Sequence, residues 1–283
     1  MAVADAKLGE ELEGLDHLDL QSPRAPRGRR LARVVLPKVI ATIAFFGAWQ
    51  LLVLSGWKPE YVIPSPFTVL KAMTENPRQL LDAAAVTMVR GAIGFTCAIV
   101  LGGFVGLLVA RLGLVRAAVG SMITGLQTMP SIAWYPLAIV VFGLGEYAIL
   151  FVVLVGAAPS IANGIITGVD QVPPLLKRAG RTMGAQGLTH LRYVVLPASL
   201  PVVVSGLKQG WAFCWRSLLA GEIIVTLSRV GLGERLQIAK DFNDYVGLYE
   251  VMIVIFVLGV LVDSLCFGTL DRAIRRRWGL LAD

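Results

Sequence analysis

The chain has 283 residues, of which 56% are hydrophobic and only 16% are charged, whereas a soluble globular domain carries about a quarter charged residues. The cations behind the net charge of +7 cluster beside apolar segments rather than alternating with aromatic residues. This pattern indicates membrane topology and excludes a nucleic-acid partner. Three cysteines stand isolated in apolar segments, without metal-ligand spacing or a disulfide framework, and we expect them only to pack: Cys97, Cys214 and Cys266.

Residues 1–33 begin acidic and become basic, and they lack the apolar core of a cleavable signal peptide. We expect a mobile cytosolic arm, either solvated or with its basic end on anionic lipid. Six apolar runs then reach the length needed to cross a hydrocarbon core of about 30 Å. They predict an all-α integral membrane protein whose helices lie near residues 34–56, 86–110, 117–143, 147–168, 202–227 and 248–270.

An even number of crossings places both termini on one side of the membrane. Arginines and lysines flank the spans on that common side, so the positive-inside tendency assigns it to the cytoplasm, together with a basic tail over residues 271–283. Pro130 and Pro136 interrupt the third span. The interruption predicts either a simple kink or two short pieces that line a pathway.

Pairs of glycines one helical turn apart occur in spans 2, 4 and 5. Small residues at this spacing allow helices to approach closely, so the pairs favour a packed bundle. The pairs are Gly102 and Gly106, Gly164 and Gly168, and Gly206 and Gly210.

The longest cytoplasmic connection contains an informative segment, residues 175–197. It resembles the EAA loop of type I ABC importer permeases, whose pattern is Glu-Ala-Ala, three residues, Gly, nine residues, an aliphatic residue, any residue, and Leu-Pro. Gly184, Val194 and the Leu196-Pro197 pair match at these intervals. The opening triplet is Arg178-Ala179-Gly180 instead, so a contact that the family makes through its glutamate is in doubt here.

The resemblance implies a MetI-like bundle of six helices, with residues 57–270 completing the permease domain after the first span. It also implies that the segment docks into a groove on a separate ATPase. Locally, we expect Gly184 to separate two short helices, the second over residues 185–193, and Pro197 to end it. A helix resting on lipid is the alternative. The residues expected to couple to the ATPase are Arg178, Ala179, Gly180, Gly184, Ala185, Gln186, Leu188, His190, Leu191, Tyr193, Leu196 and Pro197.

Further segments between Val62 and Trp278 are similar to the nitrate, sulfonate and taurine branch of these importers. They include residues 63–66, Trp215-Arg216 and the tail at 275–278. This resemblance implies an assembly in the cell inner membrane of two copies of the chain, two ATP-binding subunits and an external solute-binding protein. ATP and magnesium would bind to the partner ATPase, with no cofactor in this chain. The expected solute is a small anion such as an aliphatic sulfonate, taurine or nitrate.

The fifth span carries a polar and aromatic stripe. Lys208, Trp211, Trp215 and Glu222 fall within about 60° on a helical wheel, whereas Arg216 lies about 120° from Glu222. Because an ionised residue at membrane depth is costly, Arg216 and Glu222 are pathway candidates. Alternatively, other spans neutralise them through residues such as Arg90 or Asp263 and lock the bundle. The candidate pathway residues are Arg90, Trp211, Trp215, Arg216 and Glu222.

Between spans 5 and 6 lies a connection on the external side, with two glycines typical of a tight turn. We expect it to form a docking surface for the binding protein or an external gate. Its residues are Ser228, Arg229, Gly231, Gly233 and Glu234.

The sequence contains no phosphate-binding loop of the Gly-x4-Gly-Lys-Ser/Thr type, so ATP must be hydrolysed on another polypeptide. His17 and His190 lie outside the predicted spans, which leaves no intramembrane Ser-His pair and no histidine cluster for a metal. We therefore expect no enzyme activity and no metal site. The alternatives are a small integral-membrane enzyme, which needs clustered catalytic groups, and an ion-coupled secondary transporter, which needs intramembrane carboxylates.

Overall fold

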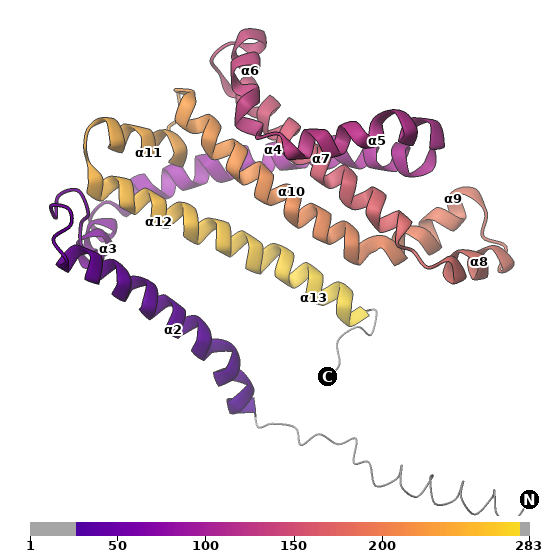
Figure 1. Cartoon of the computed structure of the whole chain (residues 1–283), viewed down its shortest axis with the longest axis horizontal. Helices are drawn as coiled ribbons and strands as arrows, with labels where there is room; N and C mark the ends of the chain where they lie inside the picture. Colours follow the sequence, from indigo (N-terminus) through magenta and orange to yellow (C-terminus); the bar gives the residue numbers. More distant parts are fainter. Residues whose placement is uncertain (1–26, 278–283) are drawn as a thin grey trace, which may run out of the picture. The chain divides into compact units, whose positions relative to one another are not determined.

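A computed structural model describes residues 27–277 of the chain, and all regular elements in that range are helical (Figure 1). The chain divides into two units, Met1–Glu60 and Tyr61–Asp283. The N-terminal arm expected over residues 1–33 lies largely outside the described residues, as does the end of the basic tail after residue 277.

The first unit contains one helix, α2 (Arg27–Leu54). Its apolar part, Val35–Leu54, is long enough to span a bilayer and is not buried, which matches the crossing predicted at 34–56. The rings of Phe46 and Trp49 stack along it, with centroids 6.1 Å apart.

The second unit is a helical bundle with short helices at its two ends (Figure 1). Its elements are α3 (Pro66–Glu75), α4 (Pro77–Arg111), α5 (Gly113–Thr128), η1 (Ser131–Trp134), α6 (Tyr135–Phe142), α7 (Glu146–Asp170), α8 (Pro174–Thr182), α9 (Gly187–His190), η2 (Leu191–Val195), α10 (Leu196–Ile224), α11 (Leu232–Asp241), α12 (Tyr245–Val262), η3 (Asp263–Phe267) and α13 (Gly268–Arg277).

Each of the six predicted crossings has a helical counterpart. Within residues 27–277, five continuous helical segments are long and apolar enough to span a membrane. The pair formed by α5 and the η1–α6 segment meets the same test, but it is bent by 103° at the break. The third predicted span therefore consists of two separate helical pieces rather than one kinked helix. Met129 and Pro130 leave the helical conformation between the two pieces, while Pro136 lies within the first turn of α6, where its missing N–H is tolerated.

The core forms where α4, α7 and α10 pack side by side (Figure 1). The glycine pairs lie at these contacts, as their spacing predicted. A Cβ added at Gly102 would come within 2.5 Å of the carbonyl oxygen of Ala158, and one at Gly164 would lie 2.6 Å from the Cα of Gly206. The three helices approach so closely because these positions carry no side chain.

The helix of the fifth span is longer than predicted. We expected Pro197 to end a short helix, but residues 187–224 form one continuous helical segment through α9, η2 and α10. The prediction is wrong because the π-helical turn η2 precedes the proline, with the Leu196 N–H bonded to the carbonyl of Leu191. Pro197 then lies in the first turn of α10, where its missing N–H costs little. Similarly, α4 begins at Pro77 rather than near residue 86.

Candidate functional site

A network that we call the polar lock surrounds the buried carboxylate of Glu222 on α10. Arg90 on α4 donates from Nη1 to Glu222 Oε1 at 2.9 Å. The hydroxyl of Thr87 and the N–H of Gly233 donate to Oε2 at 2.8 Å and 3.0 Å. Both carboxylate oxygens are thus satisfied, and Glu222 is neutralised by another span, one of the two alternatives that the sequence left open.

The remaining bonds of Arg90 extend the polar lock to α7 and to the connection before α11. Its Nη2 donates to the carbonyl oxygen of Arg229 at 2.8 Å and to Glu146 Oε1 at 3.3 Å. The Thr87 hydroxyl accepts from the N–H of Leu232 at 2.8 Å. One guanidinium group therefore holds four segments together at this end of the bundle.

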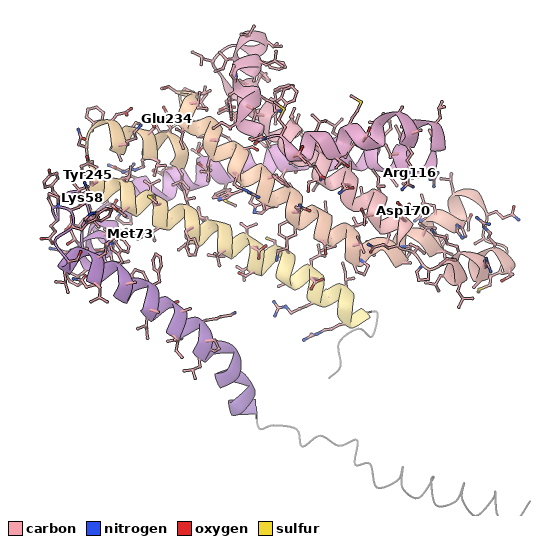
Figure 2. All side chains as sticks on the ribbon, viewed as in Figure 1. Lys58, Met73, Arg116, Asp170, Glu234 and Tyr245 are labelled. Atoms are coloured by element: carbon pink, nitrogen blue, oxygen red, sulfur yellow. The ribbon has the colours of Figure 1, made fainter. Side chains whose placement is uncertain are left out.

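The two glycines between α10 and the first turn of α11 are required by close approach rather than by a turn. A Cβ at Gly233 would lie 2.6 Å from both the Leu219 carbonyl oxygen and the Glu222 Cβ, and one at Gly231 would collide with the Glu222 carboxylate. Gly231, Gly233 and Glu234 are buried. Glu234, labelled on α11 in Figure 2, accepts from the N–H of Leu227 at 3.3 Å. These three residues thus belong to the interior of the chain.

Of the five residues predicted to dock a binding protein or to form a gate, Ser228 and Arg229 are exposed and the other three are buried. Among the predicted residues, Ser228 and Arg229 are therefore the two whose side chains can contact a docked protein. No local sequence pattern marks the inward position of the other three residues, because a Gly-x-Gly segment suits a solvent-exposed turn equally well.

Trp211 and Trp215 turn inward from α10. Their rings stack with centroids 5.9 Å apart, and Phe95 meets Trp211 edge-on at 5.3 Å. Lys208, on the same stripe, pairs with Asp263 at 3.0 Å. The charged groups of the stripe are thus paired within the chain, and its two tryptophans pack in the core.

Arg216 differs from the other four candidate pathway residues because its side chain is exposed. It lines a cavity of about 380 Å³ at the break between α5 and η1. Ser131 lies on the same cavity, and its hydroxyl is 2.6 Å from that of Ser217. We call this space the break cavity. The sequence indicated Arg216 but not Ser131, since no local pattern marks the residues that a broken span brings to α10.

At the opposite end from α11, α8 and α9 form a helical hairpin (Figure 1). Gly184 has a φ of +84°, which favours glycine, and the N–H of Ala185 bonds to the carbonyl of Gly180 at 3.0 Å. A Cβ at Gly180 would lie 2.7 Å from Val194. The glycine therefore separates α8 from the long helical segment that begins with α9, and Gly180 allows the two arms to pack.

The hairpin presents apolar and basic side chains to its surroundings. Leu175, Met183, Leu188 and Tyr193 are between 68% and 86% exposed. Its cations are not balanced locally, because residues 171–200 contain no Asp or Glu. Among the residues predicted to couple, those that are exposed are Arg178, Ala179, Gly184, Gln186, Leu188 and Tyr193, and those that are buried or partly buried are Gly180, Ala185, His190, Leu191, Leu196 and Pro197.

An ion pair joins α5 to α7 beside the hairpin. Arg116 Nη1 donates to Asp170 Oδ1 at 2.9 Å, and Nη2 donates to the other carboxylate oxygen. Both labelled side chains lie near the start of α8 in Figure 2. The sequence indicated Arg116 only as a topological cation and did not single out Asp170, because nothing relates two positions so far apart in the chain.

The described residues contain no group of three potential metal ligands. What they do contain is a bundle of membrane-length helices, a buried polar lock at one end and an exposed hairpin at the other. This arrangement is that of a multi-pass membrane protein. The chain belongs to the family of binding-protein-dependent transport system inner membrane components, whose sequence model matches residues 98–279. It is thus a multi-pass inner-membrane ABC transporter permease and not an enzyme, as predicted.

Relatives support the same assignment. A putative ABC transporter permease of Methanocaldococcus jannaschii is 29% identical over 82% of this chain and 86% of its own length. The taurine transport system permease protein of Escherichia coli is 27% identical over 74% of this chain and 79% of its length. The nitrate import permease protein of Leptolyngbya laminosa is 25% identical over 87% of this chain and 94% of its own length.

The fold is shared with solved structures. The MetNI methionine ABC transporter, in inward-facing conformations, contains a chain with a TM-score of 0.58 and 24% identity, covering 70% of this chain and 96% of that one. A chain of an amino acid ABC transporter, crystallised with histidines, has the same TM-score and 18% identity. The match covers 73% of this chain and 97% of that one. The predicted MetI-like bundle is therefore confirmed.

Proposed function

We propose that this permease imports a small anion by alternating access, driven by ATP hydrolysis on a separate subunit that holds the α8–α9 hairpin. The observation that carries the proposal is the hairpin itself: it exposes Leu188 and Tyr193 next to uncompensated arginines, at the end of two core helices. ATP and magnesium bind to the partner ATPase. The proposed assembly contains two copies of this chain, two ATP-binding subunits, and an external solute-binding protein.

The contacts of the hairpin suit it to transmit force. On its entry side, Lys177 Nζ donates to the carbonyl oxygen of Val169 at the end of α7, at 3.0 Å. On its exit side, α9 passes through η2 into α10 without a break. The ring of His190 bonds to the Lys177 carbonyl at 3.1 Å and ties the two arms together. A partner that moves the hairpin would thus move α7 and α10, and its differential affinity for the two orientations drives the change.

The distribution of cations supports one orientation of the helical bundle in the membrane. Arg111 ends α4 and Arg116 lies in the first turn of α5. The junction of these two helices lies at the same end of the bundle as the α8–α9 hairpin, which carries further arginines (Figure 1). By the positive-inside tendency this end faces the cytoplasm, and six crossings place both termini there. The opposite end, with α11 and the exposed Ser228 and Arg229, then faces outward, where the solute-binding protein docks.

The solute class is inferred from the relatives. The taurine and nitrate permeases described above are joined by a bicarbonate transport system permease protein of Synechococcus elongatus, 27% identical over 83% of this chain and 87% of its length. All three names refer to small solutes with an anionic group. An aliphatic sulfonate, taurine, nitrate or bicarbonate is therefore the proposed cargo.

Gly184 allows a direct test. The variant Gly184→Val places a β-branched residue at a φ of +84°, which distorts the hairpin although a Cβ there meets no neighbour. In proteoliposomes that contain the complete complex, we expect it to abolish binding-protein-stimulated ATP hydrolysis and uptake while the permease still inserts into the membrane. The matched control is Gly113→Val at the same end, where a Cβ is also free of neighbours but φ is not positive.

Three outcomes would contradict the proposal. The first is full ATP-driven uptake by the Gly184→Val complex. The second is uptake by this chain without an ATPase. The third is uptake that follows an ion gradient instead of ATP hydrolysis, which would favour a secondary transporter.

A further inference from the structure

Arg216 is a cation without a counter-charge in the part of the chain that the structure describes. Its Nε donates to the Ala212 carbonyl oxygen at 3.0 Å, and its guanidinium lies over the Phe213 ring, 4.9 Å from the centroid. No carboxylate within residues 27–277 forms an ion pair with it. By contrast, Arg90 and Lys208, the other cations deep in these helices, are paired. An unpaired guanidinium in a span needs water or an anion.

The break cavity supplies further donors. Gln127 Oε1 accepts from Asn163 Nδ2 at 3.4 Å, whereas Gln127 Nε2 is buried and has no hydrogen-bond partner among the described residues. The hydroxyls of Ser131 and Ser217 share one bond, so a donor or acceptor remains available. The lining contains no Asp or Glu. The cavity thus combines one full positive charge with an available hydroxyl, and the unpartnered Gln127 amide beside it, shielded from solvent, would donate once it turns toward the cavity. This combination suits an oxyanion.

We propose that the break cavity is a transient subsite for the anionic group of the solute, with Arg216 as its charged ligand and Gln127 and Ser131 as hydrogen-bond donors. The inference rests on the proposed function for the identity of the solute, and it adds where in the chain that solute is held. The volume of about 380 Å³ lies at the lower end of the range for small-molecule sites. One guanidinium matches one sulfonate, nitrate or bicarbonate group, and apolar residues such as Met129 and Ile132 contact the rest.

The electrostatic part can be tested without transport. In a background with Cys97→Ala and Cys266→Ala, the variant Ile132→Cys places a half-exposed thiol on the cavity, while Cys214 stays buried. The assembled complex in membrane vesicles is treated with sulfonatoethyl methanethiosulfonate, an anion, or with its trimethylammonium analogue, a cation. Rates are normalised to those of a small thiol in solution.

We expect the anionic reagent to react at least about tenfold faster than the cationic one, because a positive wall concentrates anions. Arg216→Gln should bring the two rates together, and Arg216→Lys should keep the preference. Taurine, nitrate or bicarbonate at high concentration should slow the anionic reaction. Two outcomes refute the subsite. One is a faster reaction of the anionic reagent that persists in Arg216→Gln. The other is equal rates for the two reagents when Arg216 is intact, which would mean that a partner carboxylate neutralises the arginine.

The second measurement is uptake of labelled taurine, nitrate and bicarbonate per ATP hydrolysed, in proteoliposomes with the complete complex. For the transported anion, Arg216→Gln should lower this ratio at least about tenfold. The control Lys208→Gln/Asp263→Asn removes a cation of the same helix together with its partner and should leave the ratio unchanged. An unchanged ratio in Arg216→Gln would overturn the subsite alone, whereas absence of ATP-driven uptake in the parent would overturn the proposed function and leave the reagent test standing.

Discussion

Arg90 and Glu222 form a buried ion pair between α4 and α10, with Nη1 and Oε1 2.9 Å apart and the carboxylate side chain fully shielded from solvent. Removing one partner of such a pair leaves an uncompensated charge, and in proteins this costs about 3–5 kcal/mol. We therefore expect Glu222→Gln to lower the thermal stability of the detergent-solubilised permease strongly. The measurement is the melting temperature of the purified chain.

A double-mutant cycle provides the control. Arg90→Met combined with Glu222→Gln should be less destabilised than the sum of the single changes, with a coupling of about 0.5–3 kcal/mol for residues in one network. Additive effects would show that the two side chains act independently and would contradict a lock built on their pairing.

Arg116 and Asp170 form a comparable pair at the other end of the bundle, but their side chains are 47% and 41% exposed. Water and salt screen such a pair, so exposed ion pairs contribute little to stability. We expect Asp170→Asn to shift the melting temperature far less than Glu222→Gln in the same assay. A comparable loss of stability would mean that burial does not determine the strength of these two pairs.

Two neighbouring glycines of α4 test the close packing of the core. A Cβ at Gly102 would come within 3.1 Å of the Ala158 Cα and closer still to its carbonyl oxygen, whereas one at Gly103 meets only a side-chain carbon of Ile165 at 4.0 Å. We expect Gly102→Ala to destabilise the permease by about 1–3 kcal/mol through overpacking. Gly103→Ala should be neutral or stabilising, because alanine favours the helix by about 0.5–1 kcal/mol. Equal effects of the two substitutions would contradict this packing.

The long apolar runs made the spans predictable, because only a helix satisfies its own backbone in lipid. The glycine spacing likewise indicated which helices approach each other. Bonds between distant positions were not predictable in the same way. The sequence offered Arg90 and Asp263 as partners of buried charges without deciding between them, and 132 residues separate Arg90 from Glu222.

Two further features depended on three-dimensional context. The π-helical turn before Pro197 has no local sequence signal, so the proline was interpreted as a helix end. Gly231 and Gly233 were assigned to an exposed loop, although their backbone approaches Glu222 too closely for any side chain. In both cases tertiary contacts decided between conformations that the local sequence allows equally.

The charge of the hairpin predicts the chemistry of its partner. Arg178 and Arg181 are exposed on α8, and the segment from 171 to 200 has no acidic residue, so a groove that receives it must be neutral or acidic. We expect Arg178→Glu/Arg181→Glu to weaken binding of the purified ATPase subunit to the permease. Binding to the parent should also fall as salt rises above about 0.1 M, where the Debye length is about 10 Å.

Arg111→Glu is the matched control, because it reverses an exposed cation at the same end but outside the hairpin. It should leave ATPase binding nearly unchanged. If reversing the hairpin charges left ATPase binding intact but released the segment from anionic vesicles, α8 and α9 would rest on lipid, the alternative that the exposed Leu188 and Tyr193 also permit. The two results differ in which partner is lost, so binding to the ATPase and to vesicles, measured on the same variants, assigns the hairpin to one of them.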